Sequence, residues 1–277
     1  MYIVQDLKVV YEDEHLIVVD KPSGTLCVPS EPGVPSLAQT VFEKCSADGS
    51  LGLARMDQMV VHRLGMDTSG LVVFAKTIEA VRGMNTLFRT RKISRQYEAL
   101  LAGHVTKDQG LINLPIMRDY EHPPYMRIST EEHQAALLDL DPDIVGKKLL
   151  QAPKDCLTHY QVISRDLLGG KEDLPVTRAT LTSVSGRTHQ LNVHCAAFGH
   201  PIVGDTVYGY NGEAAPNGGL SEEALKETAS ADRASEDLQQ RIAAASTGKN
   251  VCVHAKSIKF LHPVSKEDCE FSSAAPF

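Results

Sequence analysis

The amino-terminal third of the chain alternates short apolar runs with polar turns. Residues 9–11 and 16–19 are apolar, largely β-branched runs on either side of a short polar turn, which predicts a β-hairpin. Ser36 and Thr77 each precede apolar residues at helical spacing, which predicts a capped helix after each of them. The uninterrupted apolar run 71–75 predicts a buried strand between these two helices.

The rest of the chain mixes strands and helices without a regular βαβ rhythm. The apolar patterns predict strands at 97–101, 126–128, 158–162, 176–184, 251–253 and 258–261. A helix is expected from the turn at Ser185 to a glycine cap at Gly199, and a second, exposed helix from Ser221 to about Ala245. This mixture predicts an α+β fold, and we interpret residues 1–277 as a single domain.

Composition excludes several classes of protein. Hydrophobic residues make up 42% and charged residues 23% of the chain, which is typical of a globular protein. No run approaches the roughly 20 apolar residues of a membrane-spanning helix, and residues 1–11 lack the pattern of a secretory signal, so we expect a cytoplasmic protein with no membrane partner. The six cysteines lack the spacing of a zinc ribbon or a redox pair, which predicts buried, reduced thiols.

The charge of the chain is unevenly distributed. The formal net charge is −7, which by itself disfavours nucleic acid as a partner. However, two segments, 131–155 and 213–248, together carry all of this excess, and we interpret them as acidic insertions. Residues 82–95 contain five basic side chains and no acidic one, and such a basic segment is suited to binding phosphates.

Three polar clusters are candidates for chemistry. Residues 62–70 form a polar loop before the buried strand, and residues 185–190 lie at a strand-to-helix turn, where free backbone N–H groups attract anions. Residues 199–209 form a turn rich in glycine. Each cluster alone is also compatible with ordinary caps and turns.

Several motifs occur in a fixed order along the chain. They are Lys21-Pro22-Ser23-Gly24, His62-Arg63-Leu64 with Thr68-Ser69-Gly70, Arg95-Gln96-Tyr97-Glu98-Ala99, Gly186-Arg187-Thr188-His189-Gln190-Leu191 with His194, Gly199-His200-Pro201-Ile202 with Gly204-Asp205, and the closing His254-Ala255 with Phe260, His262-Pro263 and Phe271. Together they resemble the RluA-like RNA pseudouridine synthases from about Val9 to Phe271. No segment of the S4 kind precedes Val9, so the chain resembles the members that consist of the catalytic domain.

The resemblance implies both a fold and an activity. The expected fold is a mixed, largely antiparallel sheet with flanking helices and a central RNA cleft. The expected activity is the isomerisation of uridine to pseudouridine in structured RNA, either rRNA or tRNA, without a metal or an organic cofactor. Because the reacting base cannot be reached inside a stack, it must be flipped into a pocket.

The resemblance also assigns roles to residues. Arg63 has the place of the cation that fills the gap left by the flipped base, Tyr97 that of a ring stacking on uracil, and Arg187 that of a partner for a catalytic carboxylate. The residues expected to bind RNA are His62, Arg63, Arg89, Arg91, Lys92, Arg95 and His189.

One position departs from the family pattern. The family loop reads His-Arg-Leu-Asp and its aspartate is catalytic, whereas this chain has Gly65 at that place. Asp67 is the nearest carboxylate, about 6.6 Å further along an extended backbone. Either Asp67 is the catalytic group, with Asp57 or Asp20 as a more distant source, or the protein is an inactive RNA-binding protein or RNA chaperone. A scaffold that contacts a protein partner through its acidic insertions is a further hypothesis.

Overall fold

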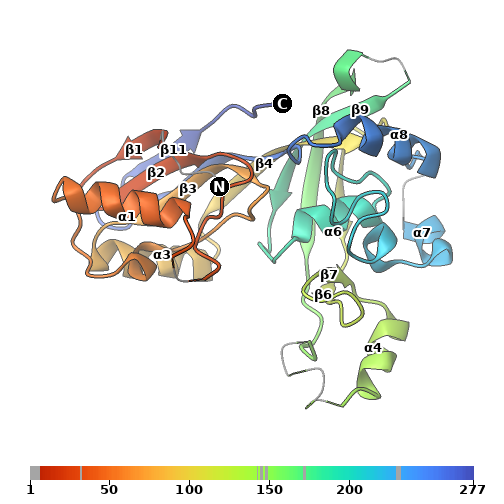
Figure 1. The fold of residues 1–277 in the computed structure, drawn as a ribbon, viewed down its shortest axis with the longest axis horizontal. Helices are drawn as coiled ribbons and strands as arrows, with labels where there is room; N and C mark the ends of the chain where they lie inside the picture. The colour runs from red at the N-terminus through yellow and green to blue at the C-terminus, as the bar shows by residue number, and fades with distance from the viewer. Residues whose placement is uncertain are drawn as a thin grey trace. The chain divides into compact units, whose positions relative to one another are not determined.

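The computed structural model describes residues 7–277 except 32, 142, 144, 145, 147, 148, 171, 172 and 229–231. Parts of the segments 131–155 and 213–248 therefore lie outside the described residues. The chain forms two compact units (Figure 1). Unit 1 consists of Met1–Tyr97 and Val253–Phe277, and unit 2 consists of Glu98–Cys252. None of the described helices is long and apolar enough to cross a membrane.

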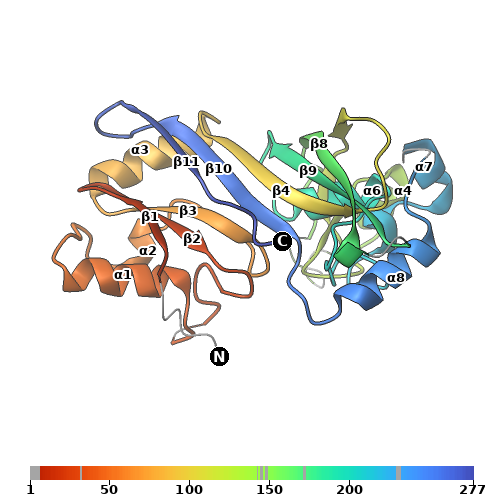
Figure 2. The ribbon, with the colours of Figure 1, turned by 90° about the horizontal axis from the view of Figure 1, so that it is seen from above.

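Unit 1 is built on strands from both ends of the chain. Its strands are β1 (Val9–Glu12), β2 (Leu16–Lys21), β3 (Ser69–Ala75), β10 (Val253–Leu261) and β11 (Asp268–Ser272). The pairs β1–β2, β2–β3 and β10–β11 are antiparallel, and β10 pairs with β3 in parallel. In Figure 2 the blue C-terminal strands run alongside the N-terminal strands of the same unit. The predicted hairpin is confirmed, and the two short strands predicted near the C-terminus belong mostly to one strand, β10.

Capped helices cover this sheet. They are α1 (Leu37–Ala47), α2 (Met56–Met59) and α3 (Ile78–Arg89). The hydroxyl of Ser36 accepts a hydrogen bond from the backbone N–H of Gln39, and that of Thr77 accepts one from Ala80, so both predicted caps are confirmed. The apolar face of α3 packs in one cluster with β2, β3 and β10. Figure 2 shows α1 and α3 on opposite sides of the strands β1 to β3.

Unit 2 is largely antiparallel. Its strands are β5 (Gln109–Asn113), β6 (Ile116–Arg118), β7 (Met126–Ile128), β8 (Leu157–Leu167) and β9 (Pro175–Ser183), together with the end of β4 (Ser94–Ala102), which begins in unit 1. Strand β8 pairs with β9 and β5, and β6 pairs with β7, all antiparallel. The α+β fold with mostly antiparallel strands is therefore confirmed.

The helices of unit 2 differ in part from the prediction. They are α4 (Glu131–Leu138), α6 (Gln190–Ala197), α7 (Glu222–Thr228) and α8 (Glu236–Ser246), with short 3₁₀ turns at Leu168–Gly170 and Pro216–Gly219. Helix α6 is as predicted, and Gly199 follows it with a positive φ of 88°. The single helix predicted from Ser221 to about Ala245 is instead two helices, α7 and α8.

The segment 213–248 also contributes to the core, so the prediction of an exposed surface helix is wrong. Leu225 of α7 is 2% exposed and Ile242 of α8 is 3% exposed. Leu220 and Leu225 pack in one cluster with Val193 of α6. The large apolar side chains are few and widely spaced in a stretch of Ala, Ser and Glu, so the composition of the segment did not indicate that it has buried positions.

The cysteines agree with the prediction in four of six cases. Cys27, Cys45, Cys156 and Cys195 are buried, and Cys252 and Cys269 are partly exposed. All six are free thiols.

Candidate active site

A buried lysine anchors the polar loop 62–70 to the turn after β2. The Lys21 side chain is fully buried, and its Nζ donates to the backbone oxygens of Pro22, Thr25 and Met66 at 2.8 to 2.9 Å. The hydroxyl of Ser23 donates to the backbone oxygen of Asp67 at 2.6 Å. These bonds fix the backbone of the loop without using the Asp67 carboxylate. Burial lowers the pKa of Lys21 to about 8, from an ordinary value of 10.5.

This lowered pKa predicts a characteristic dependence of stability on pH. Between pH 8 and 10.5 the unfolded chain holds the Lys21 proton and the folded chain has lost it, so the free energy of unfolding should rise with pH. Buried thiols titrate in the same range, and the variant Lys21→Met, measured by urea unfolding at the same pH values, subtracts their effect. From pH 8 upward, the free energy of unfolding of the parent should rise relative to that of Lys21→Met. Parallel pH profiles would contradict the lowered pKa of Lys21.

The loop presents its polar side chains to solvent. Arg63, Gly65 and Asp67 are all exposed, whereas Leu64 between them is buried at 8% exposure. Among the residues that the structure describes, the Asp67 carboxylate has no hydrogen bond or ion pair, and the charge of Lys21 acts on it. The Asp67 carboxylate is thus available to a ligand.

The other two candidate carboxylates are already engaged. Asp20 forms an ion pair with Lys8 at 2.7 Å and accepts a hydrogen bond from Ser273. Asp57 forms an ion pair with Arg55 at 2.7 Å on the surface of α2. Their engagement favours Asp67 over both as the source of a free carboxylate.

Contacts among His62, Phe88 and Arg95 join this loop to the basic segment at the end of α3. The centre of the His62 ring lies 4.9 Å from that of the Phe88 ring. The Arg95 guanidinium lies over the same Phe88 ring, 5.6 Å from its centre. His62 Nε2 accepts a hydrogen bond from the backbone N–H of Val73, and burial lowers the pKa of His62 to about 3. His62 is therefore neutral and anchors the loop. The next residue, Arg63, is exposed and supplies the positive charge.

The basic segment is available to a polyanion. Four basic side chains are exposed along α3 and just beyond it: Arg82 within the helix, Arg89 at its last residue, and Arg91 and Lys92 after it. Within the described part of the chain none of them forms an ion pair. These four residues and Arg95 together are called the basic surface. Tyr97, the predicted stacking residue, follows in β4 and is 8% exposed.

In unit 2 the turn that carries Arg187 is organised by a buried glutamine. The Gln190 side chain is 2% exposed, and its Oε1 accepts from the Ser185 hydroxyl at 2.9 Å and from the Arg187 backbone N–H at 3.0 Å. Its Nε2 donates to Leu157 and Thr158 of β8 at 2.9 and 3.0 Å. One amide thus ties the turn to the sheet.

The Arg187 side chain is only partly satisfied by the protein. Its Nε is buried without a hydrogen-bond partner, and it forms no ion pair among the described residues. Its guanidinium lies beside the thiol of Cys156, whose pKa is raised by burial and held down by Arg187. A half-buried guanidinium with a free N–H is suited to gripping an anion.

His189, in the same turn, has a backbone conformation in the left-handed region. Its φ is 52°, and its Nδ1 lies 2.7 Å from the hydroxyl of Tyr208. The Tyr208 hydroxyl also accepts a hydrogen bond from the backbone N–H of Met126 at 3.0 Å, and burial raises the pKa of Tyr208. His189 itself is exposed.

The glycine-rich turn at 199–209 has a structural explanation. Asp205 Oδ1 accepts from the backbone N–H groups of Val207 and Tyr208, both at 2.9 Å. A side chain at Gly204 would place its Cβ 2.8 Å from the backbone oxygen of Asn250. These contacts shape the turn. His200 Nε2 is buried without a hydrogen-bond partner and lies 3.8 Å from the Asp232 carboxylate.

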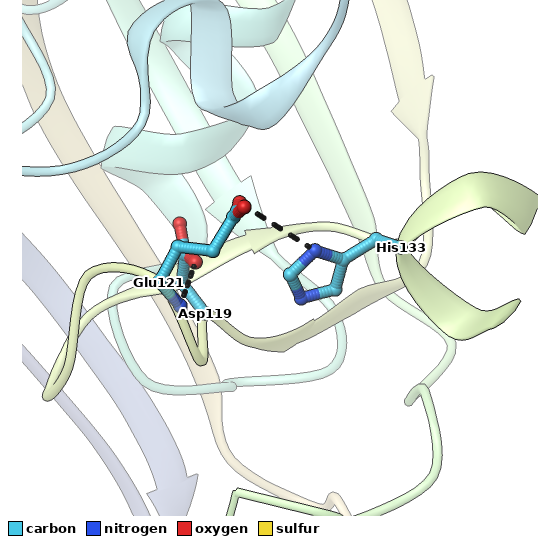
Figure 3. A group of neighbouring side chains, drawn as sticks. All are labelled: Asp119, Glu121 and His133. Atoms are coloured by element: carbon cyan, nitrogen blue, oxygen red, sulfur yellow. Dashed lines mark hydrogen bonds and ion pairs between the residues drawn. The ribbon is translucent and has the colours of Figure 1, made fainter. Parts of the chain in front are cut away.

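One group of side chains has the composition of a metal site. Asp119, Glu121 and His133 offer ligand atoms within 4.8 Å of one another, near the β6–β7 hairpin and α4 (Figure 3). However, Arg127 Nη1 lies 3.1 Å from Glu121 and 4.0 Å from Asp119, so a guanidinium already supplies the positive charge there. Burial, followed by the charge of Arg127, lowers the pKa of His133. We interpret the group as an ion network that fixes the hairpin.

Comparison with known proteins agrees with this architecture. A model of the RNA pseudouridylate synthase family matches residues 15–197. The dual-specificity RNA pseudouridine synthase RluA of Pasteurella multocida is 30% identical over 98% of this chain and 94% of its own length. The RluA of Yersinia pestis is 36% identical over 73% of this chain and 82% of its own length. The structure of human RNA pseudouridylate synthase domain containing 1 has a TM-score of 0.64, 23% identity, and covers 100% of this chain and 86% of that one.

These likenesses define an RNA-modifying isomerase fold, and the chain belongs to the RNA pseudouridylate synthase family. Sequence reasoning found the loop, the basic surface and the Arg187 turn. It did not recognise Lys21 and Gln190 as the buried residues that position them. A lysine and a glutamine inside otherwise apolar or turn-forming motifs were the available signal.

Proposed function

We propose that this synthase isomerises uridine to pseudouridine in structured RNA, either rRNA or tRNA. In this reaction the N1–C1′ bond breaks, the uracil turns, and a C5–C1′ bond forms, while C5 loses a proton and N1 gains one. The base reaches the enzyme by flipping out of its stack.

The observation that carries the proposal is the continuity of the loop and the basic surface in unit 1. His62 contacts the Phe88 ring and Arg95 lies over that ring, so the segment that carries the exposed Arg63 lies against the basic surface. In a chain whose net charge is −7, a local face of unpaired cations supports binding to a polyanion.

Each residue is assigned a role by its own chemistry. Asp67 supplies the carboxylate that the reaction needs, because it is exposed and unpaired among the described residues. Tyr97 stacks on the uracil ring, and Arg187 keeps a carboxylate ionised and oriented. Arg63 fills the space of the flipped base, and the basic surface, with His62 and His189, contacts the RNA.

The direct test is to incubate the purified protein with total RNA from a strain that lacks pseudouridine synthases and to map new pseudouridines. New sites in rRNA or tRNA would support the proposal and name the substrate. Absence of new sites together with intact RNA binding would overturn the enzyme and leave an RNA-binding protein. Absence of both would overturn the RNA function altogether.

The basic surface predicts a steep dependence of RNA affinity on salt. The triple variant Arg89→Gln, Arg91→Gln, Lys92→Gln should lower the slope of log affinity against log salt by about 2, because each phosphate contact contributes about 0.7 to 0.9. Fluorescence anisotropy with a labelled RNA across a salt series measures this slope. Lys259→Gln, which removes an exposed cation paired with Glu270 in the same unit, is the control and should leave the slope unchanged. Equal slopes in the parent and the triple variant would place the RNA elsewhere.

Location and partners follow from the same proposal. Six free thiols fit a reducing compartment, which supports a cytoplasmic enzyme. A protein partner for the acidic segments is supported by their exposed carboxylates on α7 and α8, such as Glu223 and Glu236.

A further inference from the structure

A cavity in unit 2 gathers three cations. Its volume is about 230 Å³, and its lining includes Arg118, Lys154 and Arg187 but no acidic residue. The floor is apolar: Ile116 is 0%, Met117 2% and Met126 8% exposed. We name this cavity the Arg187 pocket. Three positive charges around a small cavity repel one another unless an anion lies among them.

The three cations are held in place by different elements. Lys154 is fixed against β6 because its backbone N–H and C=O bond to Ile116 at 2.8 and 3.0 Å. Arg118 lies two residues further along β6, and its Nη1 donates to the backbone oxygen of Pro124 at 3.2 Å. Arg187 comes from the turn before α6, which Gln190 fixes. The cations therefore converge from three separate stretches of the chain.

Opposite charges at neighbouring positions lie in different surroundings. Arg118 lines the pocket, whereas the next residue, Asp119, is fully buried beside Glu121 and His133 (Figure 3), with Arg127 Nη1 at 4.0 Å. No carboxylate of that network lines the pocket. Arg187, whose Nε is buried without a hydrogen-bond partner, also lines the pocket.

We propose that the Arg187 pocket binds a phosphate group of the RNA backbone, with the adjoining ribose on the apolar floor. This proposal rests on the proposed function and adds a second phosphate-binding site, in unit 2, to the basic surface of unit 1. The guanidinium of Arg118 and the ammonium of Lys154 match the oxygens of one phosphate, while Arg187 adds its positive charge to the pocket and keeps its role toward the carboxylate. Lys154 comes from the segment 131–155, so a segment that is acidic overall contributes a cation to the RNA site.

The test uses the full chain and leaves Arg187 intact. The variant Arg118→Gln, Lys154→Gln removes two charges from the pocket, and Lys107→Gln, Lys249→Gln removes two exposed charges from unit 2 outside it. Anisotropy with a short fluorescent oligouridylate is measured over a salt series. We expect the pocket variant to lose affinity by about tenfold and to lower the salt slope by about 1, while the control changes neither.

The outcomes separate this proposal from the function on which it rests. Equal affinity and slope in the pocket variant and the control, with a parent that binds the oligouridylate, would overturn the pocket and leave the enzyme. A parent that does not bind would overturn both. Inorganic phosphate, added against chloride at constant ionic strength, is the second probe. Saturable competition by phosphate that the pocket variant abolishes would support an RNA phosphate in the pocket. Phosphate that binds the parent but not the pocket variant, without displacing the oligouridylate, would assign the pocket to free phosphate and overturn the RNA assignment.

Discussion

Gly65→Asp should raise pseudouridine formation by about a hundredfold or more if the glycine has simply replaced the family's carboxylate. The structure accommodates the change. The backbone at Gly65 is outside the left-handed region, and an added Cβ would meet only the Thr68 hydroxyl, at 3.5 Å. The position is exposed, so an ionised side chain is not desolvated there. Release of tritium from RNA labelled at C5 of uracil measures the rate.

The alternative assignment makes the opposite prediction. If Asp67 is already the catalytic group, Gly65→Asp should lower the rate, because two close carboxylates compete for one cation and cannot both stay ionised. Asp67→Asn should then abolish activity. It should change little if Gly65 has replaced the catalytic carboxylate and Asp67 does not supply one. Gly65→Asn is the matched control, since it has the shape of aspartate without its charge. Inactivity of the parent and all three variants, with RNA binding intact, would exclude the enzyme.

Arg187→Lys and Arg187→Ala should each lower the rate of pseudouridine formation by about a hundredfold or more. A lysine has neither the planar fork nor the Nε–H that lies buried and unpartnered in this chain. The experiment is done in the parent or, if the parent is inactive, in Gly65→Asp. Lys249→Gln, a change at an exposed residue of unit 2 that does not line the Arg187 pocket, should have little effect.

Thermal unfolding distinguishes a lost reaction from a lost fold. Arg187 forms no ion pair within the described residues, so its removal should change the free energy of unfolding by less than about 1 kcal/mol. Full turnover by Arg187→Lys would remove the proposed role of the guanidinium.

Much of the fold follows from local patterns. The hairpin of β1 and β2 and the helices after Ser36 and Thr77 were predictable because β-branching and capping act over a few residues. The strand β6 was missed because it is only three residues long and depends on pairing with β7 and Lys154. The break between α7 and α8 was missed because no proline or strong periodicity marks it.

The candidate site was predictable to a smaller extent. The loop and the Arg187 turn were found from motifs, but the function of Lys21 is set by a bond to Met66, which lies 45 residues away. The Arg187 pocket likewise needs Lys154 beside Ile116, a contact that no local pattern encodes. Long-range contacts of this kind depend on tertiary packing, which a single sequence does not display.

The divided path of unit 1 has a consequence for its synthesis. Ser69 and His254, which lie 185 residues apart, share a hydrogen bond of 2.9 Å where β3 meets β10 in parallel. Unit 2 is continuous and lies wholly between these two parts of the chain. On the ribosome, the nascent chain therefore emerges with all of unit 2 before β10 and β11 are translated. Unit 2 can fold during elongation, whereas the sheet of unit 1 cannot be completed until β10 and β11 have been translated.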